Sequence, residues 1–331
     1  MKLVIAGAGS IGCYCGGLLA DAGHHVTLLG RARVLDPIRQ NGLTVTDYSG
    51  LRKTIPAGCL TLSEGPACLS DADLVLVAVK TGATAEMARL IAAHAPAAAP
   101  VISWQNGMEN ARTLRTALPG RDVRAGMVPF NVVPVGPATW HRATSGDIVI
   151  QSGPGELARR LSSPDLPVTE TDGIEAVQWG KLVINLNNAL NALSGLTLRE
   201  QLLNRDWRRL MADQMAEALA VLAASGRPVA STTPLPVWMT PHILRLPTPL
   251  FSRIAARMLT IDPAARTSMA YDLDAGRPTE IDSLQGEIIR LGRETGTPTP
   301  ICDRVAGLIT RGETGPLTPD QIRAGLSGIG G

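Results

Sequence analysis

A glycine-rich turn near the amino terminus constrains the fold of this chain more than any other feature. The turn reads Gly-Ala-Gly-Ser-Ile-Gly over 7–12 and lies between an apolar run at 3–6 and a helical pattern at 11–22. In such a turn the first glycine permits a tight bend, the second lets a pyrophosphate approach the backbone, and the third lets helix and strand pack closely. The helix end directs N–H groups and positive potential at the anion. This context predicts a dinucleotide-binding unit, rather than a turn without a ligand, with phosphate contacts at Gly7, Gly9, Ser10, Ile11 and Gly12.

Short apolar runs alternate with helical patterns through about residue 165, and helical patterns dominate after about residue 173. Such alternation is typical of a parallel sheet with right-handed crossovers, and 331 residues suffice for two domains. We therefore predict an α/β fold: a Rossmann-type domain over 1–170, finished by extra and in part antiparallel strands, and an all-α domain over 171–331. Segment 225–249 is expected to form a loop or short helices. The expected strands are 3–6, 25–29, 74–79, 101–104, 132–133, 147–151 and 167–169, and the expected helices are 11–22, 83–94, 109–118, 174–193, 198–224, 250–259, 268–274, 281–295 and 300–309.

The residues after the second expected strand favour NADP over NAD. An NAD site usually places a carboxylate here to hold the ribose 2′-hydroxyl, but this chain reads Gly-Arg-Ala-Arg over 30–33, and the first carboxylate is Asp36. Gly30 leaves room for a 2′-phosphate, Arg31 can bind it through charge-assisted hydrogen bonds, and Arg33 is a second candidate. The alternative is that both arginines are ordinary solvated side chains.

Two polar residues follow the next expected strands. Lys80 comes directly after 74–79, and Asn106 stands close behind 101–104. Because ligands of open α/β sheets bind at the carboxyl ends of the strands, we expect Lys80 to reach cofactor or substrate oxygens and Asn106 to bond the nicotinamide-side ribose or a lysine. Asn-Gly is also a common turn dipeptide, so the alternative is that Asn106 only shapes the turn.

A polar stripe interrupts the apolar segment 179–191. At about 100° per residue, Asn185 and Asn188 project from the same helical face as Lys181. Burying one ammonium and two amides is costly unless each finds a partner, so this helix either pairs tightly with another element or holds a polar small molecule. A further cluster lies at 266–282, where Thr279, with Asp282 three residues later, is expected to be the N-cap of the next helix and Glu280 to lie in its first turn, where the helix dipole favours its charge.

Together these motifs resemble those of the ketopantoate reductase (2-dehydropantoate 2-reductase) family, and the resemblance covers nearly the whole chain. It implies a Rossmann domain followed by a helical domain, with the active site between them. It also implies reduction of ketopantoate to pantoate with NADPH, a step toward pantothenate and coenzyme A. By the same resemblance Lys181 and Glu280 are the catalytic residues. The substrate-binding residues would be Asn185, Asn188, Ser268 and Asn106.

One position departs from the family pattern. Many members place a further asparagine eight residues after the lysine, where this chain has Ala189. Asn188 lies on the right helical face to substitute for it, whereas Asn191 lies farther round the helix. The departure bears on the identity of the substrate more than on the chemistry.

The implied chemistry needs a proton donor, because hydride addition to a ketone builds negative charge on its oxygen. Lys181 would donate that proton, and burial can lower a lysine pKa toward the working pH. Glu280 would bond the substrate hydroxyl. Three alternatives stay open: a structural ion pair of Lys181 with Glu280, a reductase of another branched 2-oxo acid or a 3-hydroxy-acid dehydrogenase, and an NADPH sensor without turnover.

Composition argues against several other classes. The formal net charge is only +2 and the basic residues are dispersed, so neither nucleic acid nor an anionic membrane is expected as a partner. No apolar run reaches the length of a membrane span. The five cysteines are odd in number and match no zinc spacing, which favours a reduced, cytoplasmic protein without a bound metal. The apolar positions of 211–222 could serve either the core or a homodimer contact.

Overall fold

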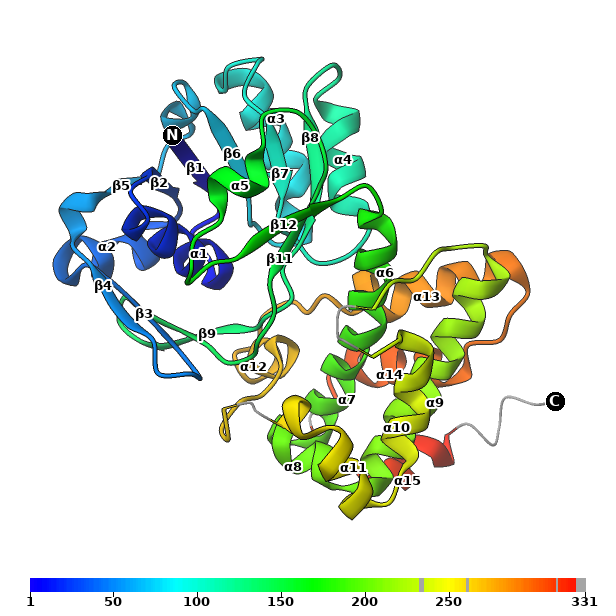
Figure 1. Ribbon diagram of the computed structural model, residues 1–331. Helices are drawn as coiled ribbons and strands as arrows, with labels where there is room; N and C mark the ends of the chain where they lie inside the picture. Colours follow the sequence, from blue (N-terminus) through cyan, green and yellow to red (C-terminus); the bar gives the residue numbers. More distant parts are fainter. Residues whose placement is uncertain (232–234, 260–261, 314, 326–331) are drawn as a thin grey trace. The chain divides into compact units, whose positions relative to one another are not determined.

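The computed structural model describes residues 1–231, 235–259, 262–313 and 315–325 (Figure 1). The chain divides into two compact units, Met1–Ile174 and Glu175–Gly331, and each is described here by itself. The first unit contains a mainly parallel sheet with helices, and the second unit is helical. The predicted α/β fold class is therefore confirmed.

The main sheet of the first unit has eight strands in the order β12-β11-β8-β7-β6-β1-β2-β5. At one edge, β11 (Ile148–Gln151) pairs antiparallel with β8, and β12 (Val168–Thr171) pairs parallel with β11. The strands that run parallel to one another are β1 (Lys2–Ala6), β2 (His25–Leu29), β5 (Leu60–Ser63), β6 (Leu74–Val77), β7 (Val101–Ser103) and β8 (Val123–Met127). Their carboxyl ends therefore share one edge of the sheet, where ligands of such folds bind.

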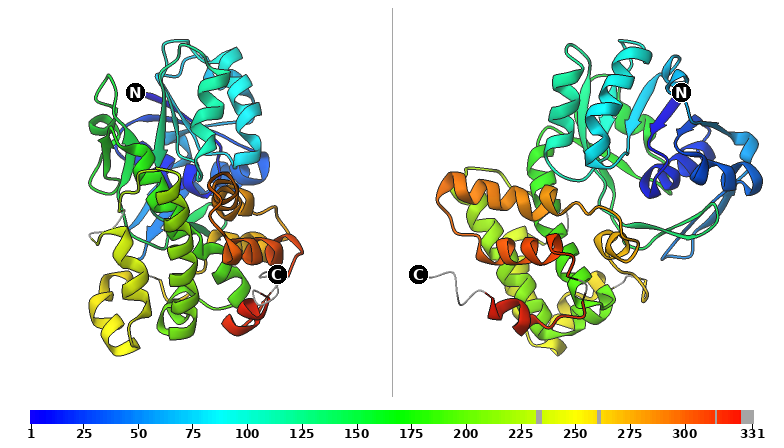
Figure 2. Two further views of the ribbon diagram at one scale, coloured as in Figure 1. Left: turned by 90° about the vertical axis from the view of Figure 1, so that its right-hand side faces the viewer. Right: turned by 180° about the vertical axis from the view of Figure 1, so that it is seen from behind.

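Both faces of this sheet are covered, which explains why β6 is apolar at every position and β1 is apolar after Lys2. In β1, Leu3 and Ile5 belong to a core cluster on one face, together with residues of α1. Val4 and Ala6 belong to a second cluster on the other face, together with residues of α3 and α4, which lie side by side (Figure 2). The helices of this unit are α1 (Ser10–Asp21), α2 (Ala32–Asn41), α3 (Thr84–His94), α4 (Glu109–Ala117) and α5 (Leu157–Leu161).

A second, four-stranded sheet packs on the outer side of α1, and most of it was not predicted. Its order is β4-β3-β10-β9, and its strands are β3 (Leu43–Asp47), β4 (Arg52–Ile55), β9 (Val132–Gly136) and β10 (Thr139–Arg142). The contact with α1 is so close that a Cβ at Gly17 would lie 2.5 Å from Cδ2 of Leu43. Because α1 is enclosed by two sheets, its residues 12–19 are all buried. This explains the absence of a polar face on a helix near the start of the chain.

The second unit is built from helices, and no strand occurs among its described residues. Helix α9 is its longest and packs against α10, α13 and α14. The apolar positions of 211–222 lie on α9 and form part of the buried core of this unit. The helices are α6 (Ile174–Asn185), α7 (Asn187–Ser194), α8 (Leu198–Leu203), α9 (Arg205–Ala224), α10 (Thr240–Arg245), α11 (Thr248–Ile254), α12 (Ser268–Asp274), α13 (Ile281–Thr295), α14 (Pro300–Thr310) and α15 (Pro319–Ala324).

Two long helices expected from the sequence are each interrupted. The helix expected over 174–193 is divided at Leu186, whose carbonyl oxygen accepts a hydrogen bond from Nε2 of Gln285 at 2.8 Å. The helix expected over 198–224 is divided at Asn204, whose Oδ1 caps the start of α9 by accepting the N–H groups of Asp206 and Trp207. At Asn204 a local side-chain bond to the backbone competes with the continued helix, and at Leu186 the interruption coincides with a side-chain bond from a distant helix.

Short 3₁₀ turns complete the secondary structure, at Ala57–Cys59, Pro66–Leu69, Thr81–Ala83, Val237–Met239 and Ala256–Leu259. The last of these occupies the end of the helix expected over 250–259. Among the helices described, none combines the length and the apolar character that a membrane crossing requires.

Candidate active site

The three glycines of the amino-terminal turn serve three different steric purposes. Gly7 has a φ of +121°, and a Cβ there would lie 2.6 Å from the backbone nitrogen of Val79. A Cβ at Gly12 would lie 2.1 Å from the carbonyl oxygen of Gly7, so only glycine lets α1 pack on the turn. At Gly9, by contrast, a Cβ would meet nothing within 4 Å. The turn is therefore fixed at its two ends and open at its centre.

The open centre coincides with the start of α1. Gly9 is the N-cap of this helix, no side chain caps it, and the first turn, which begins with Ser10 and Ile11, contains no acidic residue. A helix end of this kind favours an anion, because the backbone N–H groups and the helix dipole point toward it. The geometry thus suits the pyrophosphate of a dinucleotide.

Arg31 and Arg33 are exposed at the carboxyl end of β2, where Arg31 is the N-cap of α2. Close packing also requires glycine at position 30, because a Cβ there would lie 2.4 Å from Cβ of Ala8 in the glycine turn. The nearby Asp36 forms an ion pair with Arg39. The cations at 31 and 33 therefore stand at the position where a 2′-phosphate would lie in a Rossmann-type site.

Lys80 and Asn106 lie in the segments that follow β6 and β7, and a buried amide that the sequence analysis missed joins these segments. Gln105 is 7% exposed, and its Nε2 donates to the carbonyl oxygen of Val79 at 2.9 Å and to Oγ1 of Thr84 at 2.7 Å. This side chain follows β7 and binds both ends of the segment that carries Lys80. The exposed Lys80 therefore lies on a backbone segment that the Gln105 side chain holds at both ends.

A second amide completes this connection. Asn110 is buried, and its Nδ2 donates to the carbonyl oxygen of Asn106 at 2.6 Å and to Oγ1 of Thr81 at 3.1 Å. Its Oδ1 accepts the hydroxyl of Thr84 at 2.7 Å. The sequence offered one indication of this network: the amide Gln105 stands beside Asn106, and a second amide, Asn110, follows one helical turn later. The partners of these two amides lie on another segment, which only the folded sheet brings close.

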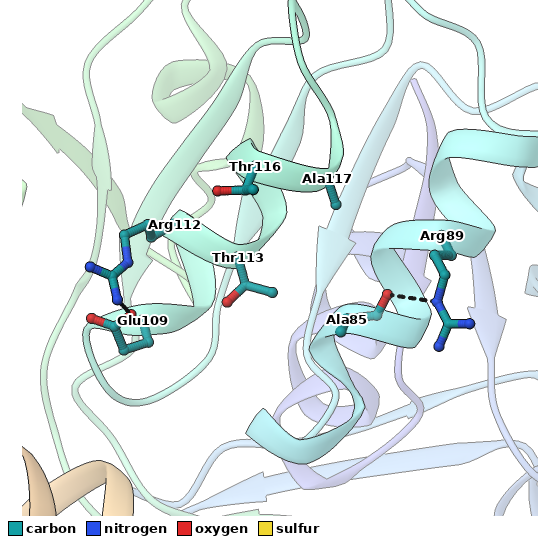
Figure 3. A pocket seen from close by; sticks show the side chains of 7 residues that line it. All are labelled: Ala85, Arg89, Glu109, Arg112, Thr113, Thr116 and Ala117. Atoms are coloured by element: carbon teal, nitrogen blue, oxygen red, sulfur yellow. Dashed lines mark hydrogen bonds and ion pairs between the residues drawn. The ribbon is translucent and has the colours of Figure 1, made fainter.

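A groove of about 420 Å³ lies between α3 and α4 (Figure 3). Its charged groups are the ion pair of Arg112 with Glu109 and the guanidinium of Arg89, whose Nε donates to the carbonyl oxygen of Ala85 at 3.5 Å. None of the residues predicted for the active site lines this groove, so it is separate from the glycine turn. The lining residues are Ala85, Arg89, Glu109, Arg112, Thr113, Thr116 and Ala117.

Lys181 lies on α6 and is half-buried. Desolvation by the surrounding protein lowers the pKa of its ammonium to about 8. Its neighbour Gly180 explains part of this packing: a Cβ there would lie 1.8 Å from the carbonyl oxygen of Ala230, whose N–H donates to the carbonyl oxygen of Ala176 at 2.9 Å. The chain around residue 230 therefore lies directly against α6 beside the lysine. An ammonium in this setting gives up its proton more readily than an exposed one.

Asn185 and Asn188 are both buried, at 6% and 8% exposure, and stand on either side of the interruption at Leu186. The backbone of Leu186 keeps helical angles, with φ −56° and ψ −27°, so the two amides still follow each other at near-helical spacing. Ala189, where the resemblance noted above led to the expectation of an asparagine, is fully buried.

Asn191 is fully buried and its amide is engaged at both ends. Its Nδ2 donates to the carbonyl oxygen of Leu196 at 3.0 Å and to Oε1 of Gln201 at 3.2 Å. Its Oδ1 accepts the N–H of Thr267 at 3.0 Å. The structure therefore uses Asn191 to connect α7, α8 and the start of α12, and of the two substitutes weighed for position 189, Asn188 is the one whose amide is not committed in this way.

Ser268 is exposed and is the first residue of α12, which packs on α7. Glu280 is half-buried and is itself the N-cap of α13, without a side-chain cap hydrogen bond. The expectation that Thr279 caps this helix was wrong: α13 begins at Ile281, as expected, and the residue before it, Glu280, is the N-cap and so precedes the first turn. The Glu280 carboxylate is therefore not used as a helix cap.

No cluster that could hold a metal ion occurs in the part of the chain that the structure describes, counting groups of three or more His, Cys, Asp or Glu. The polar residues predicted for the active site are cations, amides, a hydroxyl and one carboxylate, which suit hydrogen bonding to an organic substrate. The expected residues thus form two groups, one around the glycine turn in the first unit and one on α6, α7, α12 and α13 in the second.

Comparison with known proteins identifies the family. The sequence profile of the family described as "Ketopantoate reductase PanE/ApbA" matches residues 3–155, and that of "Ketopantoate reductase PanE/ApbA C terminal" matches residues 173–313. A 2-dehydropantoate 2-reductase of Halobacterium salinarum is 28% identical over 319 residues, covering 93% of this chain and 98% of the relative.

Solved structures give the same result. A PanE/ApbA family ketopantoate reductase from Ralstonia eutropha JMP134 is 31% identical, with a TM-score of 0.79 over 98% of this chain and 100% of that one. A 2-dehydropantoate 2-reductase from Geobacter metallireducens GS-15 is 26% identical, with a TM-score of 0.78 over 94% and 99%. D-mandelate dehydrogenase, solved with NADH and anilino(oxo)acetate, shares the fold at 22% identity and a TM-score of 0.76, over 98% and 100%. The chain therefore belongs to the ketopantoate reductase family, a family of NAD(P)H-dependent oxidoreductases.

Proposed function

We propose that this oxidoreductase reduces ketopantoate to pantoate with NADPH, in the pathway to pantothenate and coenzyme A. The observation that carries the proposal is Lys181, a half-buried lysine whose pKa is lowered to about 8 and which shares its helical face with two buried amides. A general acid works best when its pKa lies near the working pH. At neutral pH this ammonium is still protonated, so it can donate.

The first unit fits NADPH at three points. The open backbone at Gly9 and the uncapped start of α1 suit the pyrophosphate. The exposed guanidinium of Arg31 suits the 2′-phosphate, which NADPH has and NADH lacks. Lys80 and Asn106, on segments held by Gln105 and Asn110, follow strands at the carboxyl edge of the sheet, where the nicotinamide-side ribose would be bound.

NADPH, when bound, supplies the hydride at C4 of its nicotinamide. In the proposal Lys181 donates a proton to the ketone oxygen as negative charge develops there. Asn185, Asn188 and Ser268 hold the carboxylate and hydroxyl of the substrate through neutral donors, which orient it without competing for the proton. The Glu280 carboxylate accepts the substrate hydroxyl and so fixes the end of the molecule opposite the donated proton.

Ala189 favours a second candidate, a reductase of another branched 2-oxo acid. A buried methyl group stands where many relatives carry an amide, so one polar contact to the substrate is absent or is made by Asn188 instead. A 2-oxo acid without the terminal hydroxyl of ketopantoate would lose less binding free energy from this change than ketopantoate does.

Steady-state oxidation of NADPH with a panel of 2-oxo acids tests the proposal. The highest kcat/KM is expected with ketopantoate. A higher kcat/KM with another branched 2-oxo acid would support the second candidate, and oxidation of 3-hydroxy acids with NADP⁺ in preference to either would identify a 3-hydroxy-acid dehydrogenase. Saturable binding of NADPH without oxidation by any of these acids would contradict an enzymatic role and indicate a sensor.

A further inference from the structure

We propose that Thr267, held by Asn191, is a positioning residue that fixes Ser268 against α7 and thereby sets how tightly the enzyme binds its 2-oxo acid. This inference rests on the proposed function, in which Ser268 contacts the substrate. Thr267 itself is 1% exposed and does not reach a ligand. Its effect would therefore act through the residue that follows it.

Both polar groups of Thr267 bind α7 rather than its own helix. Thr267 is the N-cap of α12, a position where a threonine hydroxyl usually accepts an N–H from the first helical turn, yet no side-chain cap hydrogen bond is present. Its Oγ1 instead donates to the carbonyl oxygen of Asn188 at 3.0 Å, and its N–H donates to Oδ1 of Asn191 at 3.0 Å. Thr267, the residue directly before the exposed Ser268, is thus bound to α7 by two hydrogen bonds.

The anchor for this fastening is itself immobilised. Asn191 donates to the carbonyl oxygen of Leu196 and to Oε1 of Gln201, and its own carbonyl oxygen accepts the hydroxyl of Ser194 at 2.8 Å. Rotation of the Asn191 side chain would break its bonds to Leu196 and Gln201 as well as the bond from Thr267, all in a fully buried site, which is costly. The acceptor for the Thr267 N–H therefore stays in one place.

Tertiary bonds, rather than the helix itself, set the direction of Ser268. Helix α12 spans only seven residues, Ser268–Asp274, and a helix of that length is marginal without packing. The bond from Thr267 to the Asn188 carbonyl also connects two proposed substrate-binding residues. Ser268 directly follows Thr267, and Asn188 carries the proposed substrate-binding amide. A shift at Thr267 would change the spacing between the hydroxyl and the amide that grip the substrate.

The test removes the Thr267 hydroxyl and leaves the rest of the side chain. Thr267→Val is nearly isosteric, and Thr267→Ser is the matched control that keeps the hydroxyl. KM for the 2-oxo acid should rise about three- to tenfold in Thr267→Val, the worth of one neutral hydrogen bond, with KM for NADPH unchanged and kcat changed less than KM. Thr267→Ser should behave like the unmodified enzyme. If Thr267→Val does not fold, Thr267→Ala removes the same bond without adding bulk.

A double-mutant cycle distinguishes positioning from general stability. If Thr267 acts through Ser268, adding Thr267→Val to Ser268→Ala should raise KM for the 2-oxo acid no further than Ser268→Ala alone. Fully additive increases would overturn the inference, as would a folded Thr267→Val enzyme with unchanged KM. Failure of the unmodified protein to reduce any 2-oxo acid would instead contradict the proposed function, so the two failures are distinguishable.

Discussion

Replacing Lys181 by methionine removes its titratable group and keeps an unbranched side chain of similar length. The lysine pKa is 10.5 in an unfolded chain and about 8 in the folded protein, a difference that corresponds to roughly 3 kcal/mol. Because the side chain is half-buried and partly reached by solvent, we expect about 1–3 kcal/mol of this to be measurable. At neutral pH, Lys181→Met should therefore unfold with a higher free energy than the unmodified protein.

The sign of the pH dependence follows from which state binds more protons. Below about pH 8 both states carry the proton, and the folded protein bears the full cost of an ammonium in a desolvated place. Between about pH 8 and 10.5 the folded state releases its proton while the unfolded chain keeps its own, so the free energy of unfolding contributed by Lys181 rises with pH. The advantage of Lys181→Met should accordingly shrink as the pH is raised through this range.

Urea denaturation of both proteins at a series of pH values measures this difference. Turnover gives an independent reading, because only the protonated amine donates: kcat of the unmodified enzyme should fall as the pH passes about 8. Lys181→Met should lower kcat roughly 10²–10⁴-fold. Two results would refute the reasoning: a Lys181→Met protein no more stable than its parent at neutral pH, or a wild-type kcat that stays level well above the lowered pKa.

Three further predictions concern backbone packing and the cofactor. Gly9→Ala should leave the melting temperature nearly unchanged and weaken NADPH binding, measured by fluorescence titration. Gly12→Ala should lower the melting temperature, because its Cβ would lie 2.1 Å from a backbone oxygen. Equal melting temperatures of the two variants would contradict the assigned roles. Gly180→Ala should cost at least about 1–3 kcal/mol in urea denaturation, because its Cβ would lie 1.8 Å from the Ala230 oxygen, and an unaltered midpoint would rule this contact out. Arg31→Ala should weaken NADPH binding roughly ten- to hundredfold and spare NADH, and an equal loss with both cofactors would remove the 2′-phosphate from the proposal.

Local sequence was enough to predict the central strands and missed the small sheet. The runs at 3–6 and 74–77 are apolar throughout because both faces are covered, and such runs stand out in any window. Strands β3 and β4 mix threonine with charged residues, and β3 pairs with β10, far along the chain, where Thr46 Oγ1 lies 2.9 Å from Nδ1 of His141. Pairing of this range is a tertiary fact that no local pattern contains.

The candidate site divides along the same line. The glycines and the stripe that begins at Lys181 follow from the spacing of residues close together in the sequence. The amides Gln105 and Asn110 do not, because their partners lie in a segment that only the sheet brings near. Thr279 was predicted as a cap from its residue type and from Asp282 three residues later, but the helix starts at Ile281, so the N-cap is Glu280.

The enclosure of α1 between two sheets has an electrostatic consequence for any anion bound at its start. Water and salt weaken the field of a surface helix within a short distance, but residues 12–19 are buried, where the effective dielectric constant is lower than in water. The field of these buried turns is therefore screened less than that of a surface helix, and Gly9 stands at the amino-terminal end, where the field would act on an anion. Leu43 and Val45 of the small sheet lie against Gly17 and exclude water from that side of α1, so in the proposed function this sheet would strengthen the binding of the cofactor pyrophosphate.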